Sequence, residues 1–82
     1  MMSESANRLL ERRELEDHWM IGQPARASGF VGTIKQAIQH VVEVDGDRQT
    51  HTRVVIECEG AAYDGGDLLI DVSSKNCEVT DS

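Results

Sequence analysis

The chain has 82 residues, a formal net charge of −7 and only three aromatic residues. A chain this short buries only about 60 to 65% of the surface that its unfolded form exposes, so it predicts one small domain over residues 1–82, with frayed ends at 1–4 and 79–82. No segment approaches the roughly 20 apolar residues that cross a bilayer, and the N-terminus lacks a basic region followed by an apolar one. We therefore expect a cytoplasmic protein without a membrane partner.

The acidic charge is concentrated in the second half of the chain. Residues 1–42 carry five acids and five bases, whereas residues 43–82 carry ten acids and three bases. Such a surface repels phosphates, which disfavours direct binding of nucleic acid. It favours a basic protein surface as the partner, including that of a nucleic-acid-binding protein. The competing interpretation is that the acids only keep the protein soluble.

The N-terminal segment is built from strong helix formers. Residues 7–17 are rich in Leu, Arg and Glu and contain neither Gly nor Pro, which predicts a helix that ends near residue 18. At 100° per residue, Arg12, Leu15 and Trp19 form a stripe apart from the face that would dock on a sheet. This stripe either packs where the helix ends or contacts a second chain. With so few aromatic residues for a core, the second interpretation predicts a homodimer through these three residues.

Residues 33–43 fit two different structures. Five apolar residues recur at helical spacing, which predicts a second helix: Ile34, Ala37, Ile38, Val41 and Val42. Against the helix, Asp45-Gly46 follows Val-Val-Glu-Val, which is typical of a β-hairpin turn. The alternative to the helix is therefore a mostly β small barrel with one N-terminal helix.

Two apolar segments, 50–58 and 67–72, alternate in the manner of strands and predict an antiparallel sheet. The expected core residues are Val54, Ile56, Leu68 and Ile70. One register opposes Ile56 with Leu68, and Val55 with Leu69. The other register opposes Cys58 with Val72 and Glu59 with Asp71. Because two carboxylates directly opposite each other repel, the first register is preferred. With the helices, this sheet predicts an α+β fold.

No motif of nucleotide binding or nucleophilic catalysis is present, and the three histidines are widely spaced. Cys58 and Cys77 lack a second cysteine nearby, so we expect free thiols, with Cys58 buried as a small hydrophobic residue. The sequence therefore predicts no cofactor, no metal site, no catalytic residue and no enzymatic activity. The enzymatic alternative would use paired carboxylates such as Glu57, Glu59 and Asp71.

The expected functional surface is one face of the 50–58 and 67–72 sheet. It combines carboxylates with apolar anchors and a loop tyrosine: Glu57, Glu59, Asp67, Asp71, Val55, Leu69 and Tyr63. Such a surface suits an inhibitor or regulator that occupies a basic partner. One version is an acidic mimic of nucleic acid, of the type that phages and mobile elements use. The alternatives are a structural homo-oligomer without a charged partner and a small enzyme that uses carboxylates.

Overall fold

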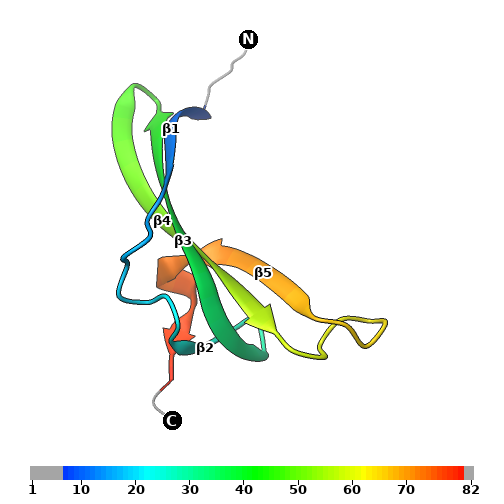
Figure 1. Cartoon of the computed structure of the whole chain (residues 1–82). Helices are drawn as coiled ribbons and strands as arrows, with labels where there is room; N and C mark the ends of the chain where they lie inside the picture. Colours follow the sequence, from blue (N-terminus) through cyan, green and yellow to red (C-terminus); the bar gives the residue numbers. More distant parts are fainter. Residues whose placement is uncertain (1–6, 81–82) are drawn as a thin grey trace.

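A computed structural model describes residues 7–80, and nearly all of its regular structure is β. Strands make up 63% of its residues and helical turns 4%, and the strands form one antiparallel sheet. The elements are β1 (Asn7–Glu14), β2 (Pro24–Ala27), β3 (Phe30–Val44), β4 (Asp47–Cys58), β5 (Leu68–Ser73), the 3₁₀ turn η1 (Ser74–Asn76) and β6 (Glu78–Val79) (Figure 1). Between residues 7 and 80 there is no helix long and apolar enough to cross a membrane.

The predicted α+β fold is wrong. Residues 7–14 form strand β1 rather than a helix, and the predicted second helix at 33–43 lies within the 15-residue strand β3. The mostly β alternative describes residues 33–43 correctly, but where it also predicts a helix, residues 7–14 form strand β1. The physical reason is that β3 has strand partners on both sides, so sheet pairing overrides a local helix preference that is weak by comparison.

The strands follow the order β5-β4-β3-β2-β6, and β1 pairs with the C-terminal half of β3. β5 and β6 stand at opposite ends of this order, yet only η1 and one further residue separate them in the chain. The sheet must therefore curl so that its first and last strands come close together (Figure 1). Thr80 extends the second edge, because its N–H donates to the carbonyl of Pro24 at 2.9 Å. The predicted fraying at 1–4 lies outside the described residues.

β3 and β4 form a long hairpin that turns at Asp45-Gly46. Both turn residues have positive φ, 51° for Asp45 and 85° for Gly46, as a two-residue hairpin turn requires. Val44 and Asp47 close the turn as a cross-strand pair. The outer part of this hairpin, with β1 alongside, projects from the curled part of the sheet (Figure 1).

The core lies inside the curled part of the sheet. Its buried residues come from the turn after β1 and from strands β2 to β4: Met20, Ala25, Ala27, Ile34, Ala37, Val54, Ile56 and Cys58. Val54 and Ile56 are fully buried as predicted, whereas Leu68 and Ile70 on β5 are only half-buried. Gly32 allows β3 and β4 to approach closely here, because a Cβ at this position would lie 2.3 Å from the Glu57 carbonyl oxygen.

Neither predicted register between β4 and β5 is correct. The structure opposes Ile56 with Ile70 and Cys58 with Leu68, which is between the two alternatives. All three registers keep the same apolar faces together, so hydrophobic alternation alone cannot distinguish them. The observed register places Val55 opposite Asp71, and so separates the carboxylates that the rejected alternative would have opposed.

Candidate functional site: the acidic β4–β5 arm

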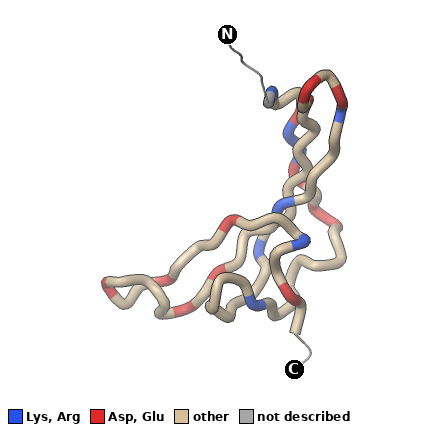
Figure 2. Tube along the Cα trace, turned by 180° about the vertical axis from the view of Figure 1, so that it is seen from behind, with Lys and Arg blue, Asp and Glu red and all other residues tan. Residues whose placement is uncertain are grey.

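The hairpin formed by β4 and β5 contains a long segment whose charged residues are all acidic. From Val54 to Ser74 the chain contains no Lys or Arg, but it contains five acids: Glu57, Glu59, Asp64, Asp67 and Asp71. We call residues 57–71, the facing strand ends and the loop between them, the acidic arm. It projects from the rest of the sheet, and acidic positions recur along it to its tip (Figure 2). The arm therefore carries only acidic charges along its own chain and extends them away from the rest of the sheet.

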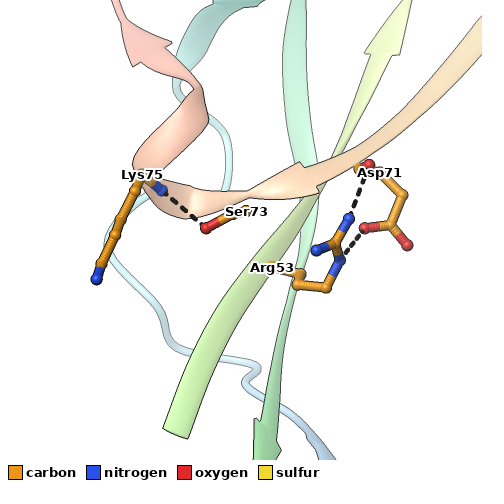
Figure 3. A network of polar contacts seen from close by, with 4 residues as sticks. All are labelled: Arg53, Asp71, Ser73 and Lys75. Carbon is orange, nitrogen blue, oxygen red and sulfur yellow. Dashed lines mark hydrogen bonds and ion pairs between the residues drawn. The ribbon is translucent and has the colours of Figure 1, made fainter. Parts of the chain in front are cut away.

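Two of these five acids have a cation beside them at the base of the arm. Lys35 Nζ lies 3.6 Å from Glu57 Oε1. Arg53 Nε lies 2.8 Å from Asp71 Oδ1, and Figure 3 shows this second pair. Sequence reasoning missed both pairs. Lys35 is brought to Glu57 by a strand pairing that was not predicted, whereas the preferred register of the two strands would have placed Arg53 opposite Asp71 and could have revealed that pair. The uncompensated charge of the arm consequently lies nearer its tip.

The loop at the tip is ordered by bonds from its own residues. Asp64 Oδ1 accepts a hydrogen bond from the Gly66 N–H at 2.9 Å, and Asp67 Oδ1 accepts one from the Gly60 N–H at 3.2 Å. The Ala62 N–H also donates to the Gly66 carbonyl at 2.9 Å. A carboxylate has about four acceptor sites, so each aspartate can hold the loop and still accept from a partner. These bonds give the exposed charges at the tip a defined arrangement.

The predicted partner-binding residues fall into two groups. Val55, Glu57, Leu69 and Asp71 share the outer face of β4 and β5, as the alternation predicts. Leu69 is 63% exposed there, while Val55 is half-buried.

The other three lie farther out, in the loop of the arm. Glu59 and Asp67 are exposed, and Tyr63 is fully exposed near the tip. The predicted surface is thus divided between a strand face with paired charges and a loop with uncompensated ones.

The three residues expected to make a dimer contact do not form one stripe. Arg12 lies on β1 opposite His40, and the Leu15 N–H donates to the Ala37 carbonyl while its half-buried side chain packs against the core. Trp19 lies in the turn after β1 and is 66% exposed. The stripe depended on helical spacing, which the strand replaces. Trp19 is the member with a large exposed apolar surface.

The cysteines and the potential metal ligands do not indicate a second functional site among the described residues. Both cysteines are free, and burial raises the pKa of the Cys58 and Cys77 thiols. Residues 7–80 contain no detected pocket and no group of three or more potential metal ligands. Comparisons with protein families, with curated proteins and with solved structures each found no match.

Proposed function

We propose that this protein is a small interaction module that binds a basic surface of another protein through the acidic arm. The observation that supports this most directly is the run of five acids without a single base between Val54 and Ser74. A field of one sign attracts a surface of the opposite sign and raises the rate at which the two meet. The proposed role is to inhibit or regulate the partner by covering that surface.

The arm also carries side chains that can hold a partner after the encounter. Tyrosine is enriched among the residues that dominate binding energy, and Tyr63 is fully exposed among the loop acids. Leu69 adds exposed apolar surface on the strand face. In this proposal the acids govern the association rate, and Tyr63 with Leu69 governs how long the complex lasts.

A partner that normally binds nucleic acid is the specific version of this proposal. Such a protein presents clustered Lys and Arg to phosphates, and a projecting row of carboxylates could occupy the same cations. This version makes a separate prediction, namely that the protein and a nucleic acid compete for the partner. If nucleic acid and the protein bind the partner together, mimicry is excluded while binding to a basic surface stands.

The experiment compares two variants that lose the same charge from different places. The arm variant carries Glu59→Gln, Asp64→Asn and Asp67→Asn, and leaves out Glu57 and Asp71 because both have cations beside them. Asparagine keeps the oxygen that accepts the loop hydrogen bonds, so the loop should persist. The control variant makes the same kind of change at exposed acids outside the arm: Glu16→Gln, Asp45→Asn and Asp47→Asn.

Each protein is immobilised and used to capture proteins from a cell extract at about 0.05 M and about 0.5 M salt, followed by mass spectrometry. We expect the wild type and the control variant to retain the same basic protein at low salt. The arm variant should lose that protein, and high salt should release it from all of them. Retention of one basic partner by the arm variant and the wild type alike would contradict the proposal.

A further inference from the structure

The edges of the sheet differ in how well they are protected against pairing with another strand. Natural proteins protect open edges with charged side chains or make the edge strand very short. β1 has five charged residues among its eight, and β6 has only two residues. β5 has six residues, of which four are Leu, Ile or Val and only Asp71 is charged. By these criteria, β5 is an unprotected edge.

No segment between residues 7 and 80 pairs with the outer edge of β5, because β5 ends the strand order. Both overall views show open space beside the part of β5 that runs into the arm (Figures 1 and 2). Leu68, Ile70 and Val72 point toward the core but are only half-buried, so apolar surface continues to this edge. The Asp71 carbonyl accepts from Arg53 Nη2 at 3.1 Å, and its second lone pair remains for a partner strand.

We propose that a second copy of this chain docks on this edge, with the two β5 strands antiparallel around a twofold axis at Ile70. The side chains specify this register. With Ile70 opposite the partner's Ile70, Leu68 lies opposite the partner's Val72, which joins the half-buried apolar residues of the two copies. On the outer face, Asp71 then lies opposite the partner's Leu69. Moving the axis to Asp71 would instead oppose two aspartates, which is unfavourable.

The charges of the two copies also favour this arrangement. Antiparallel pairing directs the two acidic arms away from each other, so their uncompensated acids are far apart. It brings Ser73, the last residue of β5, opposite the partner's Asp67, and Lys75 follows two residues later in η1. Lys75 is exposed, and its side chain extends away from Asp71 within its own chain (Figure 3). Its ammonium would therefore be attracted to the carboxylates at the base of the partner's arm, of which the partner's Asp67 is the first.

This dimer differs from a contact through Leu15, Trp19 and Arg12, and it does not depend on the proposed function. It would continue the sheet from one copy into the next and bury the half-exposed apolar residues of β5 in both. It would also present two acidic arms at opposite ends of the assembly. A partner with two basic sites could then engage both arms, which raises the effective affinity.

The test uses two substitutions at one exposed position. Leu69→Glu places a carboxylate opposite the partner's Asp71, whereas Leu69→Lys removes the same apolar side chain and places an ammonium there. Sedimentation from about 1 to about 200 µM should show the wild type moving from one chain mass of 9.1 kDa toward twice that mass. We expect Leu69→Glu to shift the dissociation constant upward at least tenfold. For Leu69→Lys, the dissociation constant of the dimer should be equal to that of the wild type or lower.

Two further measurements separate this contact from others. Leu69 faces Glu57 within the chain, so circular dichroism of each variant at low concentration checks that the monomer still folds. Hydrogen exchange of the β5 amides in the wild type should slow as concentration rises, and Trp19→Ala should dimerise like the wild type. A wild type that stays monomeric at 200 µM, or equal dimerisation by Leu69→Glu and Leu69→Lys, would overturn the proposal. So would β5 amides whose exchange does not depend on concentration.

Discussion

Arg53 reaches diagonally across the sheet to Asp71 and bonds it at two points. Its Nε donates to the carboxylate at 2.8 Å, and its Nη2 donates to the backbone carbonyl at 3.1 Å (Figure 3). Arg53 itself lies opposite Ser73, so the contact runs diagonally to the residue two positions away on β5 in the observed register of β4 and β5. The pair thus links the position of the acidic arm to the alignment of the strands that carry it.

Arg53→Ala should lower the free energy of unfolding modestly. Both side chains are more than a third exposed, so screening by solvent limits the loss to a few tenths up to about 1 kcal/mol. Urea unfolding at low and high salt measures this loss, which should shrink as salt rises. Arg48→Ala, at an exposed arginine of the same strand, is the control. Equal losses for Arg53→Ala and Arg48→Ala at low salt would contradict a specific role for the pair.

The two faces of β4 should respond differently to truncation. Ile56 is fully buried, so Ile56→Ala should cost about 2 to 5 kcal/mol, which is enough to unfold much of a marginal domain. Val55 is half-buried on the opposite face, and Val55→Ala should cost clearly less. Thermal unfolding of both variants compares these losses. Similar losses would mean that the outer face is covered as completely as the core.

Gly32 is required by its neighbours rather than by its own backbone angles. A Cβ there would lie 2.3 Å from the Glu57 carbonyl oxygen and 2.8 Å from Cys58 Sγ, so Gly32→Ala should cost about 3 kcal/mol, at the upper end of the usual range for overpacking. Gly29 has φ of +82° with nothing near its position, and Gly29→Ala should cost only about 1 to 2 kcal/mol of backbone strain. Chemical unfolding should therefore show a larger loss at Gly32. The reverse order would contradict the close approach of β3 to β4.

The two thiols should differ in reactivity. Burial raises the pKa of both above the ordinary value of 9.0, so at neutral pH both remain protonated and react slowly. Cys77 is half-exposed and should be modified by a thiol reagent first, whereas buried Cys58 should react only when the domain opens. Since burial favours the protonated thiol, the contribution of the two thiols to folding stability should be constant below pH 9 and decrease as the pH rises above it. Mass spectrometry of partially labelled protein tests the order, and modification of Cys58 before Cys77 would contradict it.

The features that the sequence predicts correctly are those with a local cause. Asp45-Gly46 marks the hairpin because Gly, and to a lesser extent Asp, tolerate the positive φ that the turn needs. The alternation around Val54 and Ile56 identifies the buried face of β4, because side chains on a strand point to opposite faces in turn. Both inferences require only neighbouring residues.

The features it misses depend on partners far away in the chain. Residues 7–14 favour a helix by composition, yet they pair with residues 38–44 of β3, and local propensity contains no information about that partner. The apolar spacing in 33–43 fits a helix and also a strand whose bulge, between Ile34 and Gln36, shifts the alternation. Lys35 beside Glu57 was missed for the same reason, because it depends on the pairing of β3 with β4.

If the acidic arm contacts a basic partner, its charges should govern the association rate constant of the complex. Stopped-flow mixing with the captured partner at low salt compares the wild type with the arm variant, Glu59→Gln, Asp64→Asn and Asp67→Asn, and with the matched control variant. We predict that the arm variant associates at least about tenfold more slowly, with a smaller change in dissociation, and that the difference narrows at high salt. Equal association rates for the arm and control variants, together with loss of binding in Trp19→Ala, would contradict the claim and assign the contact to the turn after β1.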